Sequence, residues 1–109
     1  MRNTWVTDVR HFLDETGGFP DLPGPARRLA DHFGAIVVAM SDLPRETIAR
    51  TQVRCRRRPR RRLCTGRIVA VIDADTRIRW ECPVCDDHGV ISGWEGTPWD
   101  MRRAGDTQH

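Results

Sequence analysis

The chain has 109 residues, 39% of them apolar and 30% charged, which suits one small folded domain and excludes a disordered polyelectrolyte. The net charge is +3, but eight arginines and no acid lie between Arg50 and Arg62, so the remaining residues sum to −5. No apolar run approaches the roughly 18 residues of a membrane span, and the opening stretch MRNTWVTDVRHFLDETGG carries acids where a signal peptide is apolar. We therefore expect a cytoplasmic protein without membrane contact, whose thiols stay reduced.

The first half of the chain carries helical periodicity. The apolar spacing predicts a helix over Thr4–Thr16, followed by the helix-breaking stretch GGFPDLPGP. A second helix is predicted with Pro25 in its first turn and its apolar stripe ending at Met40. A short third helix is predicted over Leu43–Arg50. The apolar positions are Trp5, Val6, Val9, Phe12 and Leu13 in the first helix, and Ala26, Leu29, Ala30, Phe33, Ile36, Val37 and Met40 in the second.

The second half changes to the alternating pattern of strands. The segment GRIVAVIDADTRIRWEC predicts two strands, Arg67–Ile72 and Arg77–Cys82, joined by a turn at DADT. GVISGW predicts a third strand, Gly89–Trp94. Residues 102–109 have no apolar anchor and are expected to form a flexible tail.

Four cysteines carry the strongest functional signal. Cys82 and Cys85 form a C-x2-C pair, and seventeen residues separate Cys64 from Cys82, within the roughly 15–20 typical of two zinc-binding pairs. The first pair, Cys55 and Cys64, has the longer spacing C-x8-C, which loop closure tolerates because its cost grows slowly with length. Asp86 directly follows Cys85, the second cysteine of the C-x2-C turn. The residue at this position usually adopts the left-handed backbone conformation. We predict a structural Zn²⁺ held by Cys55, Cys64, Cys82 and Cys85.

Three other interpretations of the cysteines stay open at this stage. Disulfides would suit a secreted protein, and four cysteines allow three pairings. CPVC could be a redox pair, although Asp86 and Asp87 directly after it would raise its thiol pKa values. His88 lies close enough in sequence to replace one cysteine as a metal ligand.

The loop between Cys55 and Cys64 holds six of the arginines. They could neutralise nucleic-acid phosphates, which gives salt-dependent affinity without sequence specificity. The alternative is a solvated loop that pairs with the acidic remainder of the chain. The candidate nucleic-acid-binding residues are Arg56, Arg57, Arg58, Arg60, Arg61 and Arg62.

The C-terminal half also resembles a known group of proteins. Its pattern, C…C-TGRIV…IRW-x-CPVC-D-x-x-GVISGWEGTPWD, resembles small bacterial zinc-ribbon-like proteins with a first cysteine pair split by an arginine/proline loop, and the match covers about residues 53–100. The resemblance implies a metal role for Cys55, Cys64, Cys82 and Cys85, with Asp86 in place of the usual glycine. It implies no activity.

These observations predict an α+β protein in which an N-terminal helical pair (residues 1–50) packs on a three-stranded, antiparallel, zinc-ribbon-like sheet (residues 51–101). The leading functional hypothesis is a protein with a structural zinc ion whose arginine loop contacts nucleic acid. A regulatory role is compatible with this hypothesis. The second is a protein-interaction adaptor, in which the helical pair supplies a homodimer or partner surface and the loop meets an acidic protein. The third is a redox protein using Cys82 and Cys85. No phosphate-cradling glycine loop, H-E-x-x-H or G-x-S-x-G occurs, so we expect no enzyme.

Overall fold

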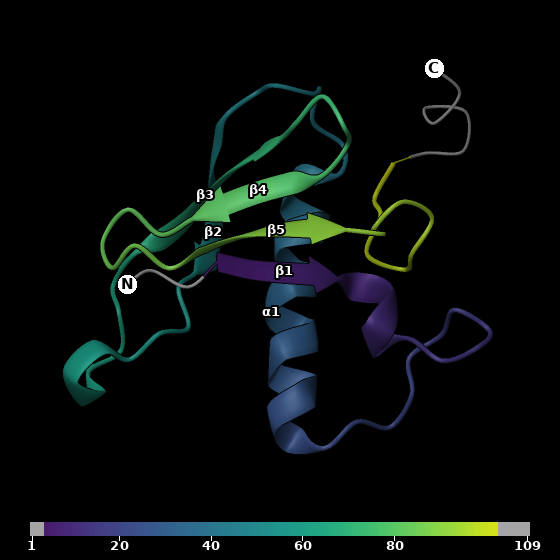
Figure 1. Cartoon of the computed structure of the whole chain (residues 1–109), viewed down its shortest axis with the longest axis horizontal. Coiled ribbons are helices and arrows are strands. Elements are labelled where there is room, and N and C mark those ends of the chain that lie inside the picture. Colours follow the sequence, from purple (N-terminus) through teal and green to yellow (C-terminus); the bar gives the residue numbers. More distant parts are fainter. Residues whose placement is uncertain (1–3, 103–109) are drawn as a thin grey trace.

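The computed structural model describes residues 4–102 and shows a five-stranded sheet with one long helix across one face (Figure 1). The order of the strands in the sheet is β1-β5-β4-β3-β2. β1 runs parallel to β5, and the other three neighbouring pairs are antiparallel. The elements are β1 Thr4–Asp8, a 3-10 turn at Val9–Phe12, α1 Gly24–Met40, β2 Ala49–Arg54, a 3-10 turn at Pro59–Arg61, β3 Arg67–Ile72, β4 Ile78–Glu81 and β5 His88–Ser92.

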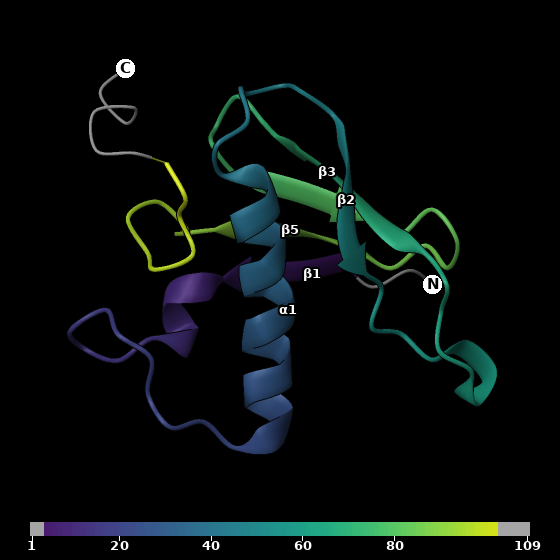
Figure 2. The ribbon, with the colours of Figure 1, turned by 180° about the vertical axis from the view of Figure 1, so that it is seen from behind.

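The core lies between α1 and the face of the sheet that α1 covers (Figure 2). Burying each large apolar side chain there stabilises the fold by about 1.5–3 kcal/mol. α1 confirms the predicted second helix, with Pro25 in its first turn and its end at Met40. The core includes Phe33, Ile36, Val37 and Met40 of α1 with Ile68, Ala70, Ile72, Ile78, Trp80 and Ile91 of the strands.

Three strands confirm the alternating pattern of the second half. β3 has the predicted bounds, with Ile68, Ala70 and Ile72 buried in alternation. β4 and β5 begin or end within two residues of the predicted positions. The turn between β3 and β4 is closed by Asp73, whose Oδ1 accepts hydrogen bonds from the backbone N–H groups of Asp75 and Arg77 at 2.9 and 3.0 Å.

The predicted helix over Thr4–Thr16 is wrong. Residues Thr4–Asp8 form β1, and only Val9–Phe12 make a single 3-10 turn. Trp5 packs against the core and Val6 points away from it, with 83% of its surface exposed. The apolar spacing suits a helix as well as a strand, and the choice is made by pairing with β5, more than eighty residues away in the chain.

The predicted third helix over Leu43–Arg50 is also wrong. The chain turns there, with Glu46 at a positive φ of 64° and its N–H donating to the carbonyl of Ile72 at 2.7 Å. Ala49–Arg54 then forms β2, which pairs with β3. The described residues therefore contain one α-helix on a five-stranded mixed sheet, not a helical pair on a three-stranded antiparallel sheet.

The C-terminal segment returns to α1. Trp99 lies against the helix backbone at Gly34, where an added Cβ would stand only 2.2 Å from Nε1 of Trp99. The ring of Trp99 also packs edge-to-face against Phe19, with the ring centroids 5.3 Å apart. The tail predicted from residue 102 onward lies, from residue 103, outside the described residues. Within residues 4–102, no helix has the length and apolar character needed to cross a bilayer.

Gly34→Ala tests the contact between Trp99 and α1. Alanine raises helix propensity by about 1 kcal/mol, but its methyl group must displace the indole, at a cost of roughly 1–3 kcal/mol. We expect a lower free energy of unfolding in urea. In a Trp99→Ala background the same substitution should stabilise the protein, and stabilisation in both backgrounds would contradict the packing.

Candidate metal centre

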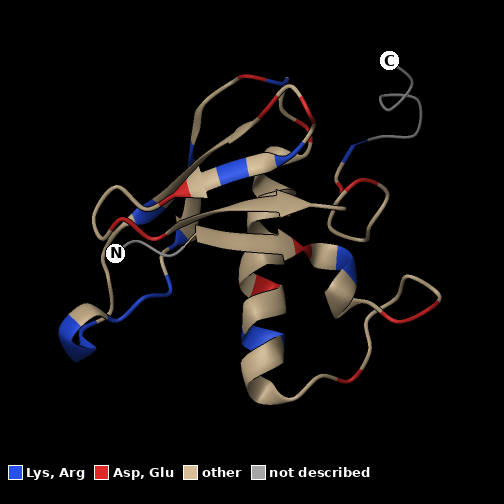
Figure 3. Cartoon of the chain, in the orientation of Figure 1, with Lys and Arg blue, Asp and Glu red and all other residues tan. Residues whose placement is uncertain are grey.

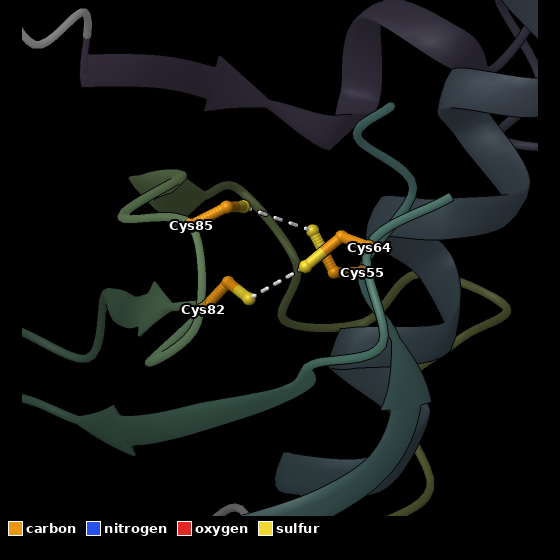
Figure 4. Close-up of side chains that lie close together, drawn as sticks. All are labelled: Cys55, Cys64, Cys82 and Cys85. Atoms are coloured by element: carbon orange, nitrogen blue, oxygen red, sulfur yellow. Dashed lines mark hydrogen bonds between the residues drawn. The ribbon is translucent and has the colours of Figure 1, made fainter. Parts of the chain in front are cut away.

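The four cysteine sulfurs converge on one point. All four Sγ atoms lie within 4.8 Å of one another. The Sγ atoms of Cys55 and Cys85 are 3.5 Å apart and those of Cys64 and Cys82 are 3.6 Å apart (Figure 4). A tetrahedral ion with bonds of about 2.3 Å to sulfur needs S···S edges of about 3.8 Å. The cluster therefore has the dimensions of a four-thiolate metal site.

Cys82 and Cys85 lie on the tight turn between β4 and β5. The N–H of Cys82 donates to the carbonyl of Asp87 at 2.7 Å, and the N–H of Asp86 donates to the carbonyl of Cys82 at 3.1 Å. Asp86 has a φ of 64°, which confirms the left-handed position expected after the second cysteine. The indole N–H of Trp5 donates to Oδ1 of Asp87 at 3.2 Å and ties β1 to this turn.

Cys55 and Cys64 lie at the base of the loop between β2 and β3. The N–H of Cys55 donates to the carbonyl of Gly66 at 2.9 Å, so the β2–β3 ladder continues by one pair beyond its strands. The N–H of Cys64 donates to the carbonyl of Arg57 at 2.8 Å. These bonds explain how an eight-residue insertion still brings both sulfurs to one place.

Gly66 is a site residue that the sequence interpretation missed. A Cβ at this position would stand 2.3 Å from Sγ of Cys82 and 3.1 Å from Cβ of Val84. Its N–H also donates to Sγ of Cys64 at 3.4 Å. The available signal was the glycine two residues after Cys64, in CTG, which is where a knuckle needs close backbone approach to sulfur.

Burial raises the pKa of the Cys55 thiol and that of the Cys85 thiol, so these two groups keep their protons when no cation is bound. The N–H of Gly66 lowers the pKa of Cys64 by hydrogen bonding to its sulfur. A dication reverses the effect of burial, because it deprotonates its thiol ligands outright. Four thiolates and a dication sum to −2, beside six arginines.

The structure bears on each alternative for the cysteines. All four cysteines are free, so no disulfide joins them. His88 is outside the sulfur cluster: its Nδ1 is 3.0 Å from the carbonyl oxygen of Asp86, and its Nε2 is 2.7 Å from Oγ1 of Thr4. Of the proposed redox pair, Cys82 is fully buried and Cys85 is partly buried, whereas a reactive redox thiol needs access to its substrate.

The arginine loop protrudes from the sheet (Figure 3), and the cysteines at its two ends belong to the cluster. All six arginines are exposed, and none forms an ion pair with a carboxylate in the described part of the chain. The loop has its own order, because the N–H of Arg61 donates to the carbonyl of Arg58 at 3.0 Å and that of Arg62 to Pro59 at 3.2 Å. Pairing with the acidic remainder of the chain therefore does not account for these charges.

Comparison with known proteins adds no relative. No protein-family model, curated protein or solved structure matches the chain significantly. The functional interpretation therefore depends on the geometry and chemistry of the site.

Gly66→Ala tests whether the close approach at Cys82 is needed for the site. The added methyl group overlaps the sulfur, so we expect loss of metal from the purified protein and a lower melting temperature. Metal per chain, measured by native mass spectrometry, checks this. Gly18→Ala is the matched control, because its Cβ would meet only ordinary contacts, the nearest at 3.5 Å. Full metal content in Gly66→Ala would refute the geometry.

Proposed function

We propose that the protein binds one structural Zn²⁺ through Cys55, Cys64, Cys82 and Cys85, and that its arginine loop binds nucleic-acid phosphates. One observation carries the proposal: both ends of the loop, Cys55 and Cys64, belong to the sulfur cluster. Binding of the ion would therefore close the loop and hold six exposed, unneutralised arginines in one place.

The donor set supports zinc in a structural role. Tetrahedral sites of four thiolates are typical of zinc or of iron–sulfur centres. Four protein ligands leave zinc no open position for water or substrate, so we propose a site without catalytic activity. The burial of three of the four cysteines agrees with an ion that supports folding rather than one that exchanges ligands.

The charge distribution supports a phosphate partner. Eight arginines lie between residues 50 and 62, while the rest of the chain is net negative. A local positive loop attracts a polyanion, and the acidic remainder limits the contact to that loop. The adaptor hypothesis placed its partner surface on a helical pair, and the described residues contain no such pair.

Metal content and chelation test the zinc proposal. We expect one zinc per chain in the native mass spectrum and no visible absorbance, whereas an iron–sulfur centre would be coloured. Since structural zinc contributes folding free energy directly, a strong chelator should lower the melting temperature by more than about 10 °C. A melting temperature that does not change on chelation would refute the proposal.

Replacing the six loop arginines with serine tests the nucleic-acid proposal. Wild-type protein should bind random-sequence DNA or RNA with an affinity that falls as salt rises. In a plot of the logarithm of the binding constant against the logarithm of the salt concentration, each neutralised phosphate should add about −0.7 to −0.9 to the slope. The variant should lose this binding while keeping its zinc and its melting temperature. Unchanged binding in the variant, or no binding by the wild type at about 50 mM salt, would refute the proposal.

A further inference from the structure

A recess of about 500 Å³ lies between the loop and α1. It is lined by Arg28 of α1 and by Arg56, Arg57, Arg58 and Leu63 of the loop. Among residues 4–102, no acid contributes to this lining. The structure thus brings a helix arginine, far away in the chain, to the same recess as one half of the loop, while Arg60, Arg61 and Arg62 lie outside it.

Arg56 also lies close enough to α1 to influence a histidine of that helix. His32 lies one turn after Arg28, and burial together with the charge of Arg56 lowers the pKa of His32 to about 4, against an opposing effect of Asp87. The ring of His32 packs between Phe33 and Trp80, with centroid distances of 5.5 and 5.9 Å. The charge of Arg56 therefore acts on the same helix that supplies Arg28 to the recess.

Arg28 adds to the positive end of α1. Its Nη1 lies 3.3 Å from the point where a Cβ on Gly24 would stand, so the guanidinium folds back over the first turn of the helix. The positive end of the helix dipole is at that turn. The recess therefore combines four arginines, one of which extends toward the first turn of α1, and this concentration of positive charge suits a bound anion.

The size and lining of the recess favour a single strand over a duplex. Its volume is within the roughly 300–1,000 Å³ of pockets that enclose a small molecule, so it fits a nucleotide rather than a double helix. Leu63 is 48% exposed and is an apolar surface among charged side chains. In a single strand the bases are free to pack on such a surface, and arginine planes stack on bases as well.

We propose that this recess is a nucleotide-binding subsite for single-stranded nucleic acid, with a phosphate between Arg28 and Arg56–Arg58 and a base or sugar against Leu63. The inference rests on the proposed function and adds a location and a strand preference to it. Single-stranded DNA and RNA share this chemistry, and the experiment compares the two.

Arg28→Gln and Arg27→Gln form a matched pair that tests the recess. Both remove one charge from the same turn of α1, but Arg27 is outside the recess and faces Asp31, with Nε 3.4 Å from Oδ1. Binding of the zinc-loaded proteins to fluorescent single-stranded DNA and RNA of random sequence is measured at several salt concentrations. We expect Arg28→Gln to bind about tenfold more weakly, with a salt slope smaller by about 0.7, and Arg27→Gln to stay within about twofold of wild type.

Leu63→Ser tests the strand preference, with Val6→Ser as its control. Val6 is also an exposed aliphatic residue, but it lies on β1, outside the recess and the sulfur cluster. Leu63→Ser should weaken binding to a normal single strand and leave binding to an abasic strand of equal length unchanged. Val6→Ser should change neither, and wild-type protein should prefer the single strand to a duplex of the same sequence.

The outcomes separate this inference from the proposed function. If wild-type protein binds nucleic acid but Arg28→Gln and Arg27→Gln behave alike, the recess is refuted and the proposed function stands. If a duplex binds as tightly as a single strand, or Leu63→Ser has no effect, the strand preference is refuted. If wild-type protein binds none of the probes, the proposed function itself fails.

Discussion

Four cysteine sulfurs within 4.8 Å of one another join the base of the β2–β3 loop to the turn between β4 and β5. These segments lie at one end of the sheet, where no strand ladder of the described residues connects the β4–β5 turn to the end of β2. Thiolates packed this closely would repel one another, and burial disfavours their charge, so a shared dication would stabilise the arrangement. Gly66 shows how closely the backbone is fitted to this contact, because a Cβ there would overlap Sγ of Cys82.

The same contact determines how the arginine loop is presented. Six like charges on a free chain would spread apart, and ordering them costs conformational entropy. Here both ends of the loop belong to the sulfur cluster, and the N–H of Cys64 bonds back to Arg57. The loop also lies beside α1, where Arg28 joins Arg56 in one recess. Under the proposed function, folding of the metal centre and presentation of positive charge are one event.

Much of the candidate site followed from short-range patterns. The spacing of the cysteines identified all four members of the cluster, and the left-handed position of Asp86 followed from its place after a knuckle cysteine. Gly66 was missed although its place two residues after Cys64 is a local signal, because the sulfur for which it clears space belongs to Cys82, sixteen residues away. Arg28 was missed for the same reason, since its helix stripe shows no sign of the loop that lies against it.

The sequence alone determined those elements whose partners are close in the chain. The helix ending at Met40 and the β3–β4 hairpin closed by Asp73 follow from local periodicity and turn chemistry. Only the tertiary structure decided that Thr4–Asp8 is a strand, because its helix-like spacing is overruled by backbone pairing with distant β5. The same holds for Ala49–Arg54, whose partner is across the arginine loop. A short apolar segment satisfies its backbone hydrogen bonds either within itself or with a neighbour, and only the folded chain supplies that neighbour.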